Sequence, residues 1–490
     1  MIYNVGTAEI VFLLMLTATF GAAFLARRHS VHHNDDGLAG RNFNRWLVGL
    51  SAGTTANSGF IVTAAVGLGY AYGIQWLMLP ISWLLGDLVF WHFFPARINA
   101  FGHASKATTL SEMLKNDLDG RMASAVAVLS ALVIIVCLAG YTSAQWLAGQ
   151  KFLSGAFHLP EYSSLGLFAI MIVAYSSIGG FRGSVYTDTL QAFIRIIGTI
   201  IALVAVVYAA YSEPIAFLRN IADSGKDFLN LFPNGTFATA IGFIVGFAAA
   251  AIGFGLGQPQ IISRYLAGSS PAETGAAKWI YIGFVQFTWI SMTTFGVLLR
   301  GVMPGISDPE TGLSVFFQNN VNAVATGIIV ADIFATIAAT SNGLLIAMTQ
   351  AVVHDLIPKV SVKQGLKIPF SAVTFAIGIL TMGVSVLIHG TVFTLAVSSV
   401  SLMGAGLAPA VIIKVMNWRH NATSLACTIG IGFLSAIAWK YTGMSTYFNE
   451  TGVGMFSGLV VNWLLCVNRQ VQLIEIPLLQ ESENTSNLDN

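Results

Sequence analysis

The sequence predicts an all-α polytopic membrane protein with about 13 transmembrane helices. Hydrophobic residues make up 55% of the 490 residues and charged residues only 9%, whereas a soluble domain carries roughly 25% charged residues. Apolar stretches of about 18 or more residues, the length that crosses a bilayer, recur along the whole chain. The net charge is +1 and no basic tract occurs. A membrane-embedded protein without a nucleic-acid partner is therefore expected.

The apolar runs divide the chain into an ordered series. The first span covers roughly 7–26 and belongs to region 1–45, which ends in a charged loop. Five spans are expected in 46–211, a polar loop in 212–236, five more spans in 237–415 and two peripheral spans in 416–470. The polar tail 471–490 is expected to be disordered. After the first, the predicted spans lie near 46–73, 75–96, 122–149, 163–179, 189–211, 237–258, 279–300, 325–350, 368–389, 392–415, 422–440 and 452–468.

The Lys and Arg residues indicate the orientation. With the amino terminus outside, seventeen of the 23 Lys and Arg residues fall in cytoplasmic segments and five fall outside. Arg195 lies within a span. Because Lys and Arg are enriched in cytoplasmic loops, we expect a multi-pass protein of the cell membrane with its amino terminus outside. The odd number of spans then places the carboxyl terminus in the cytoplasm.

Two of the predicted spans carry residues that interrupt a helix. One contains the small, polar run 51–59, and the other contains Gly253, Gly255 and Gly257 followed by Gln258-Pro259. The two spans are five helices apart, so they run in opposite directions, as an inverted five-plus-five repeat requires. Broken helices of this kind place free backbone groups at the middle of the membrane. The alternative is that the small residues only allow neighbouring helices to pack closely.

One polar segment, 179–191, carries the most specific motif of the chain. It reads Gly-Gly-Phe-Arg-Gly-Ser-Val-Tyr-Thr-Asp-Thr-Leu-Gln and is expected to form a polar hairpin between two spans. Its order of Gly-Gly, Thr-Asp and Gln resembles the signature of the sodium/solute symporter family, which includes sodium-coupled proline and pantothenate transporters. Further segments resemble the proline-type branch of that family; they are Ser51–Gly53 with Ser58-Gly59, Tyr141 with Ala148-Gly149, Gly257–Pro259 with Arg264, and Ala338–Ser341 with His354–Leu356.

The resemblance implies a LeuT-like, five-plus-five inverted-repeat core with one helix before it and two after it. It also implies one sodium ion between the first and eighth core helices. Carried over by position, its ligands would be the backbone carbonyls of Thr54, Asn57 and Thr336 and the side chains at Ala339 and Thr340. Family members usually offer two adjacent hydroxyls where this chain has Ala339 and Thr340, so one side-chain ligand is missing here. The resemblance makes sodium the expected coupling ion, and the missing ligand makes a proton the alternative.

The resemblance also implies a substrate site at the middle of the membrane. The matching positions are Ser58, Gly59, Tyr141 and the stretch from Ala251 to Gly255. Proline transporters have aromatic residues in this part of the sixth core helix. We therefore expect a wider and less aromatic pocket there, which argues against proline as the substrate. A purely structural role for Tyr141 is the alternative.

Several charged residues within the spans require partners or functions, because an isolated charge in the membrane is costly. Arg195 follows Asp188 by seven residues on one helix face, so the pairs Asp188–Arg195 or Asp87–Arg195 are expected. Asp188 is also a candidate for guiding the ion. Asp332 shares a face with Thr340 and lies about 12 Å from it, where it would attract cations, carry a proton or remain a shielded carboxyl.

The leading functional hypothesis is sodium-coupled uptake of a small polar solute, an amino acid or a related compound, by alternating access. Proton-coupled or uncoupled transport and a transporter-like sensor are the alternatives. No nucleophile, base and orienting group occur at a catalytic spacing, so an enzyme is not expected. The expected partners are a small-molecule substrate and the lipid bilayer.

Overall fold

The computed structural model describes residues 6–30, 38–232, 237–356, 369–388 and 390–466, and within them it is helical with no strand beyond a single bridge between Phe43 and Gly268. The predicted tail 471–490 lies outside the described residues. The helices of the first half are α1 (Thr7–Ser30), α2 (Arg45–Ala56), α3 (Gly59–Val62), α4 (Ala64–Tyr72), α5 (Met78–Phe93), α6 (Pro95–Ser105), α7 (Leu110–Lys115), α8 (Gly120–Phe157), α9 (Glu161–Ser212) and α10 (Pro214–Asp223). Those of the second half are α11 (Phe237–Gly257), α12 (Pro259–Leu266), α13 (Pro271–Ala276), α14 (Lys278–Val302), α15 (Gly312–Asn320), α16 (Ala323–Gln350), α18 (Phe370–Leu387), α19 (Val392–Val415), α20 (Ala422–Tyr441) and α21 (Glu450–Cys466).

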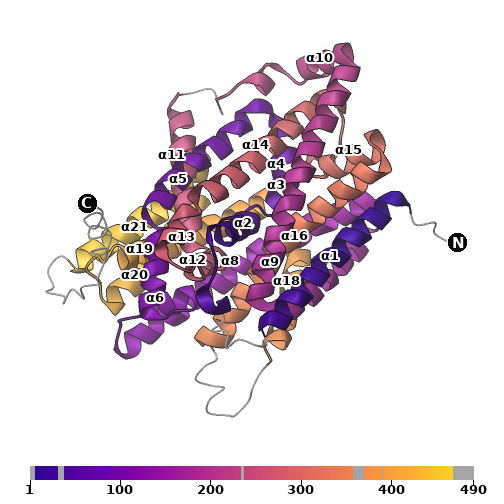
Figure 1. Cartoon of the computed structure of the whole chain (residues 1–490). Coiled ribbons are helices and arrows are strands. Elements are labelled where there is room, and N and C mark those ends of the chain that lie inside the picture. The colour runs from indigo at the N-terminus through magenta and orange to yellow at the C-terminus, as the bar shows by residue number, and fades with distance from the viewer. Residues whose placement is uncertain (1–5, 31–37, 233–236, 357–368, 389, 467–490) are drawn as a thin grey trace, which may run out of the picture.

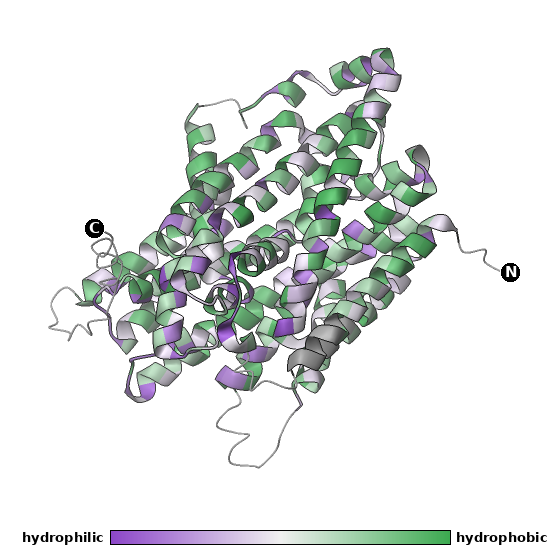
Figure 2. Cartoon of the chain, in the orientation of Figure 1, coloured by the Kyte–Doolittle hydropathy of each residue, from purple (hydrophilic) through white to green (hydrophobic). Residues whose placement is uncertain are grey.

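Nine helical stretches among these residues are long and apolar enough to cross a membrane, and three shorter apolar helices accompany them. The long stretch Gly59–Phe93 includes parts of two predicted spans, whereas the other stretches follow the predicted spans one by one. Figure 2 shows hydrophobic residues along most of the length of the outer helices. The prediction of a polytopic, all-helical membrane protein is confirmed. The count of thirteen spans stays a prediction.

Both predicted helix breaks are present. α2 ends at Ala56, and α3 begins at Gly59 after Ser58, whose side chain accepts a hydrogen bond from the Phe60 N–H. α11 ends at Gly257, and α12 begins with Pro259 at its first position. Proline lacks a backbone N–H and clashes with the preceding turn, so it ends one helix and starts the next. Local sequence therefore explains both interruptions.

The connection at 179–191 is shorter than the sequence analysis predicts. Only Gly180 leaves the helical conformation, with φ 57° and ψ −165°, and helix resumes at once. Glycine adopts positive φ without a steric penalty, so a single residue is enough to divide α9 into two helices. The polar residues of the motif, Arg182 to Gln191, thus belong to the first turns of a helix instead of a polar hairpin. Three of them have partners on other segments: Arg182 donates to the Ala39 carbonyl, and Ser184 and Asp188 contact Arg264.

The broken helix α2–α3 lies in the middle of the bundle (Figure 1). α2 packs against α9, α12, α14 and α16, and α3 packs against α8, α14, α16 and α19. α1 covers α9 and α16 on one side, while α19, α20 and α21 contact one another on the other side. The interrupted segment is therefore enclosed by helices from both halves of the chain.

Candidate functional site

The break in the α2–α3 segment lies directly against α16. The Thr340 hydroxyl donates a hydrogen bond to the backbone carbonyl of Thr55, at 2.9 Å. One turn to either side, Ile337 approaches Gly59 and Gly343 approaches the Thr55 side chain. The segment of α16 that carries the predicted sodium residues therefore runs alongside the free end of α2. This register brings Thr340 against the end of α2, and its role in binding an ion stays a proposal.

The other predicted sodium residues are buried near this contact. The hydroxyl of Thr54 and the side-chain carbonyl oxygen of Asn57 are buried without a hydrogen-bond partner among the described residues. Ala339 is fully buried and supplies no side-chain oxygen. Thr336 directs its hydroxyl to Asp332, at 3.4 Å. A hard cation prefers oxygen ligands. The side chains of Thr54 and Asn57 supply such oxygens, whereas the side chain of Ala339 supplies none.

Two polar side chains that sequence reasoning did not select hold the broken segment in place. Gln145 of α8 accepts a hydrogen bond from the Gly59 N–H, at 2.9 Å, and so satisfies a donor at the start of α3. Thr288 of α14 accepts one from the Asn57 side-chain amide, at 2.7 Å. Both lie in apolar runs, where a buried polar residue must find a partner. The position of each polar residue within an apolar run was the sequence feature that could have identified them.

A buried charge network lies one turn before the break. Arg264 of α12 forms an ion pair with Asp188 of α9, at 3.0 Å, and neither side chain is more than 1% exposed. Ser51 and Thr55 of α2 donate hydrogen bonds to the same carboxylate, at 2.7 and 3.3 Å. Arg264 also donates to Ser184, at 2.9 Å. Thr55 therefore connects this network, through its side chain, to the Thr340 contact, through its carbonyl.

The predicted pairing of Arg195 is wrong. Arg195 forms an ion pair with Asp332 of α16, at 2.5 Å, and both side chains are 1% exposed; it pairs with neither Asp188 nor Asp87. Seven residues along a helix separate two side chains by about 10 Å, so Asp188 is too distant, whereas α16 packs directly on α9. A role of Asp332 or Arg195 in gating stays a proposal.

A cavity of about 60 Å³ adjoins the break in α2–α3. The predicted substrate residues Ser58 and Tyr141 line it, together with Asn57 and Ser401. Gly59 does not line it, because its backbone faces Gln145 and Ala148 of α8. Ligand pockets usually measure roughly 300–1,000 Å³, so this cavity is well below the usual size of a ligand pocket. Its aromatic wall consists of Phe60, Trp83, Phe247, Phe254, Tyr281 and Trp289.

The prediction that Ala251 and Gly255 line the substrate pocket is wrong. Ala251 and Gly255 face α5: Ala251 approaches Gly86, and a side chain at Gly255 would collide with the Phe90 ring. The neighbouring residues Ala250 and Phe254 line the cavity instead. One residue turns a helix by about 100°, so a shift of one position exchanges the two faces.

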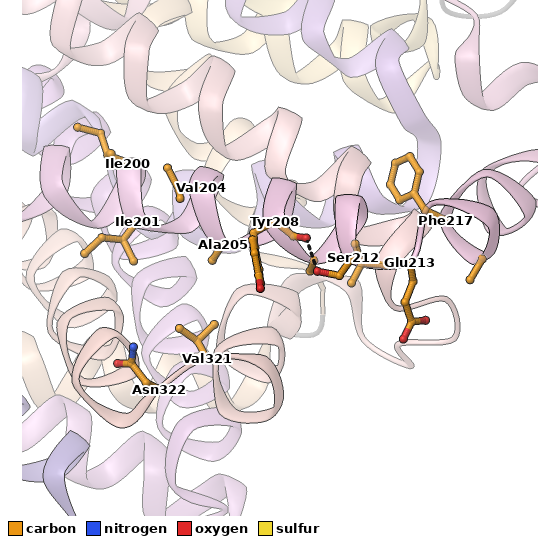
Figure 3. Close-up of a pocket in the computed structure, with 14 residues that line it drawn as sticks. Ile200, Ile201, Val204, Ala205, Tyr208, Ser212, Glu213, Phe217, Val321 and Asn322 are labelled. Carbon is orange, nitrogen blue, oxygen red and sulfur yellow. Dashed lines mark hydrogen bonds between the residues drawn. The ribbon is translucent and has the colours of Figure 1, made fainter.

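A larger groove, of about 830 Å³, lies away from both helix breaks. It is lined by the end of α9, by the start of α10, by the end of α14 and by Val321 and Asn322 between α15 and α16. Figure 3 shows Val204 and Tyr208 of α9 with Glu213 and Phe217 farther along. None of the predicted site residues lines it. The small cavity at the break, with the ion-site residues beside it, is therefore the candidate functional site.

Comparison with known proteins assigns the family. The sequence model of the sodium:solute symporter family matches residues 37–430. The chain belongs to this family. The resemblance found in the sequence is thereby confirmed. Because the members of this family are transporters, the chain is a transporter and not an enzyme.

Two relatives of the symporter family are proline transporters. The chain is 23% identical over 458 residues to the high-affinity proline transporter PutP of Bacillus subtilis, covering 89% of this chain and 93% of that protein. It is 26% identical over 324 residues to sodium/proline symporter 2 of Staphylococcus saprophyticus, covering 65% of this chain and 62% of that protein. These relatives agree with the likeness to the proline-type branch.

The fold also matches a solved transporter structure. A substrate-bound, outward-open Na⁺-coupled sialic acid symporter superimposes with a TM-score of 0.78 and 17% identity, covering 96% of this chain and 99% of that one. At this identity the likeness establishes the shared fold.

Proposed function

We propose that this protein is a sodium-coupled symporter that imports a small polar solute across the cell membrane by alternating access. The observation that carries the proposal is the contact of Thr340 with the Thr55 carbonyl at the break between α2 and α3. It joins the candidate ion site, on α2 and α16, to the cavity at Ser58. An ion and a solute bound there would share one broken helix, which is the physical basis for coupling their binding.

The ion site would use the residues predicted from the sequence. The backbone carbonyls of Thr54, Asn57 and Thr336 and the Thr340 hydroxyl supply oxygens of the kind that a hard cation prefers. Ala339 lacks the second hydroxyl, and the adjacent Ser341 donates to the Ile337 carbonyl of its own helix. The buried Thr54 hydroxyl, which has no hydrogen-bond partner among the described residues, is the available replacement.

The cavity favours a small organic solute with an apolar part and a few polar groups. Aromatic and aliphatic side chains supply most of its wall, while Asn57, Ser58, Tyr141 and Ser401 supply hydrogen-bonding groups. An amino acid or a related compound fits this combination. At about 60 Å³ the cavity has to widen before it admits such a solute, which is consistent with alternation between closed and open forms.

We extend the proposal to the topology. The breaks at Asn57-Ser58 and at Gln258 lie five predicted spans apart, which suits an inverted five-plus-five repeat with one helix before it and two after it. The distribution of Lys and Arg supports an amino terminus outside and a carboxyl terminus in the cytoplasm. Cysteine labelling from each side of the membrane tests this orientation.

Uptake into proteoliposomes tests the transport proposal. Labelled proline and sialic acid are suitable first probes, because relatives or fold neighbours carry these names. Uptake that requires an inward sodium gradient supports sodium coupling. Uptake that follows the pH gradient and ignores sodium contradicts it and favours proton coupling on the same fold.

The Thr340→Ala variant tests the ion site. We expect the apparent sodium affinity to fall about tenfold or more, since one charge-assisted oxygen contact is worth roughly 1.5–3 kcal/mol. The measurement is equilibrium binding of radioactive sodium to purified protein. Thr340→Ser keeps the hydroxyl and is expected to keep the affinity. Thr349→Ala, on the same helix but bonded to Leu345 and Thr374, is the control for a buried threonine outside the site. Equal sodium affinities for all variants would exclude Thr340 from the site.

A further inference from the structure

Asp87 is a buried carboxyl group that the proposed transport mechanism does not use. It lies in the middle of α5 and is 1% exposed. One of its carboxylate oxygens is buried without a hydrogen-bond partner in the part of the chain that the structure describes. Burying an ionised carboxylate without a partner is strongly unfavourable. Asp87 therefore needs either a cation or a proton.

No cation faces Asp87 from the described helices packed against it. The other two aspartates that are buried within the described residues have arginine partners: Asp188 pairs with Arg264 and Asp332 pairs with Arg195. α11, which packs against α5, has no ionisable residue, and neither has the segment 73–77. The charged groups of the remaining neighbours are directed elsewhere. On α6, Arg97 contacts the Phe93 carbonyl and Met416, and His103 contacts the Gly268 carbonyl. On α14, Lys278 lies over the Trp279 ring, and Arg300 lies over the Tyr70 ring and donates to Ser224, while the exposed His92 of α5 packs against Phe93.

The groups that do surround Asp87 are neutral and can donate hydrogen bonds. Tyr265 of α12 and Tyr281 of α14 are close enough for an electrostatic interaction with its carboxyl group. Trp91, one turn later on α5, contacts both rings, at centroid distances of 5.3 and 5.0 Å. The Tyr265 hydroxyl and the Trp91 indole N–H are buried without partners within the described residues. Asp87 thus lies in a buried cluster with spare hydrogen-bonding groups.

This cluster connects to the candidate substrate site. Tyr281 lines the cavity at the helix break, as does Tyr141. Tyr141 lies within electrostatic range of Tyr281, and its hydroxyl lies close to the Ser58 side chain at the start of α3. The series Asp87, Tyr281, Tyr141 and Ser58 therefore leads from the buried carboxyl group to the broken helix. A change of the cavity between dry and hydrated forms would reach Asp87 through Tyr281.

We propose that Asp87 is a proton-binding site behind the substrate cavity and that its proton stabilises the closed form of the transporter. This inference rests on the proposed transport function. In the closed form the carboxyl group is dry and holds one proton on an oxygen. Opening of the cavity admits water, which solvates the carboxylate and accepts the released proton. Low pH therefore favours the closed form, and high pH favours the open form.

Infrared spectroscopy of the purified full-length protein tests the site without requiring transport. A protonated carboxylic acid has a distinct C=O stretching band that a carboxylate lacks. We expect this band in the wild type at neutral pH, its loss in Asp87→Asn and a shift of its frequency in Tyr265→Phe, which removes a neighbouring hydroxyl. Gel filtration establishes that the variants are folded. Absence of the band from the wild type, or its persistence unchanged in Asp87→Asn, would overturn the proposal.

Labelling of the cavity tests the link to opening. A cysteine at the cavity residue Ser401, in a background without the native cysteines, reports access of a small thiol reagent. After correction for the intrinsic pH dependence of thiolate reactivity, measured on an exposed cysteine, we expect labelling to rise by up to about tenfold per pH unit through the titration of Asp87, the limit for one linked proton. In Asp87→Asn this rise should vanish, and a rise that persists would contradict the link. Failure of the sodium-binding prediction for Thr340→Ala would leave these results unchanged, so the two proposals fail independently.

Discussion

Replacing Asp188 with alanine is expected to destabilise the folded protein by about 3–5 kcal/mol, the usual effect of removing one partner of a buried ion pair. The Arg264 guanidinium is 1% exposed and would remain charged in a dry environment. Ser51 and Thr55 would also lose their acceptor. The measurement is the apparent melting temperature of the protein in detergent, monitored by fluorescence-detected gel filtration.

The double variant Asp188→Ala with Arg264→Met removes both charges and should recover a large part of this loss, because no buried charge is then left without a partner. Asp223→Ala, an exposed aspartate on α10, is the matched control and should melt like the wild type. An unchanged melting temperature in Asp188→Ala alone would show that the pair does not support the fold. Failure of the double variant to recover would indicate that the hydrogen bonds to α2 matter more than the charge balance.

The second large effect is expected at the crossing of α4 and α14. A methyl group at Gly296 would lie 2.1 Å from the Val66 carbonyl oxygen, and one at Gly69 would lie 2.3 Å from the Thr293 carbonyl oxygen. These contacts are with backbone, so the two helices would have to separate. We expect Gly296→Ala to lose at least about 1–3 kcal/mol of stability, the range for overpacked cores, and to yield less folded protein.

Gly283→Ala provides the matched control, since it is the same substitution in the same helix. Gly283 is exposed, and a methyl group there would meet nothing within 4 Å. Its melting temperature should equal or exceed that of the wild type, because alanine favours helix over glycine. Equal melting temperatures for the two variants would mean that α4 and α14 are free to move apart. The crossing holds the second half of the broken helix, so a loosened variant should also bind sodium more weakly.

The breaks in α2–α3 and α11–α12 could be predicted because their causes are local. Pro259 lacks a backbone N–H and clashes with the preceding turn, and the run before Gly59 combines residues that are poor at continuing a helix. The same holds for the spans, since an apolar run needs no partner to be recognised. The family motif at 179–191 could also be recognised in the sequence, although the structure has a turn at Gly180 in place of the predicted hairpin.

The pairing of charges could not be predicted. Arg195 had two candidate partners on the basis of depth and helix face, yet its partner is Asp332, which is 137 residues away in the chain. The charge of Arg195 requires only that some carboxylate lie near it, and several carboxylates lie at a similar depth in the membrane. Which one is near depends on the helix that packs against α9. Gln145 and Thr288 escaped selection for the same reason, since each acts on a backbone or side chain of a distant helix.

By itself, the sequence determined the membrane-embedded helical class, the family and the places where helices break. These properties depend on hydropathy, on glycine and proline, and on short motifs, all of which act over a few residues. The tertiary structure alone decided that Ala250 and Phe254 face the cavity while Ala251 and Gly255 face α5, and that Asp87 has neutral neighbours. The physical reason is that helix rotation and helix packing are set by all the neighbouring helices together, and a turn of about 100° per residue converts a small rotation into a different set of contacts.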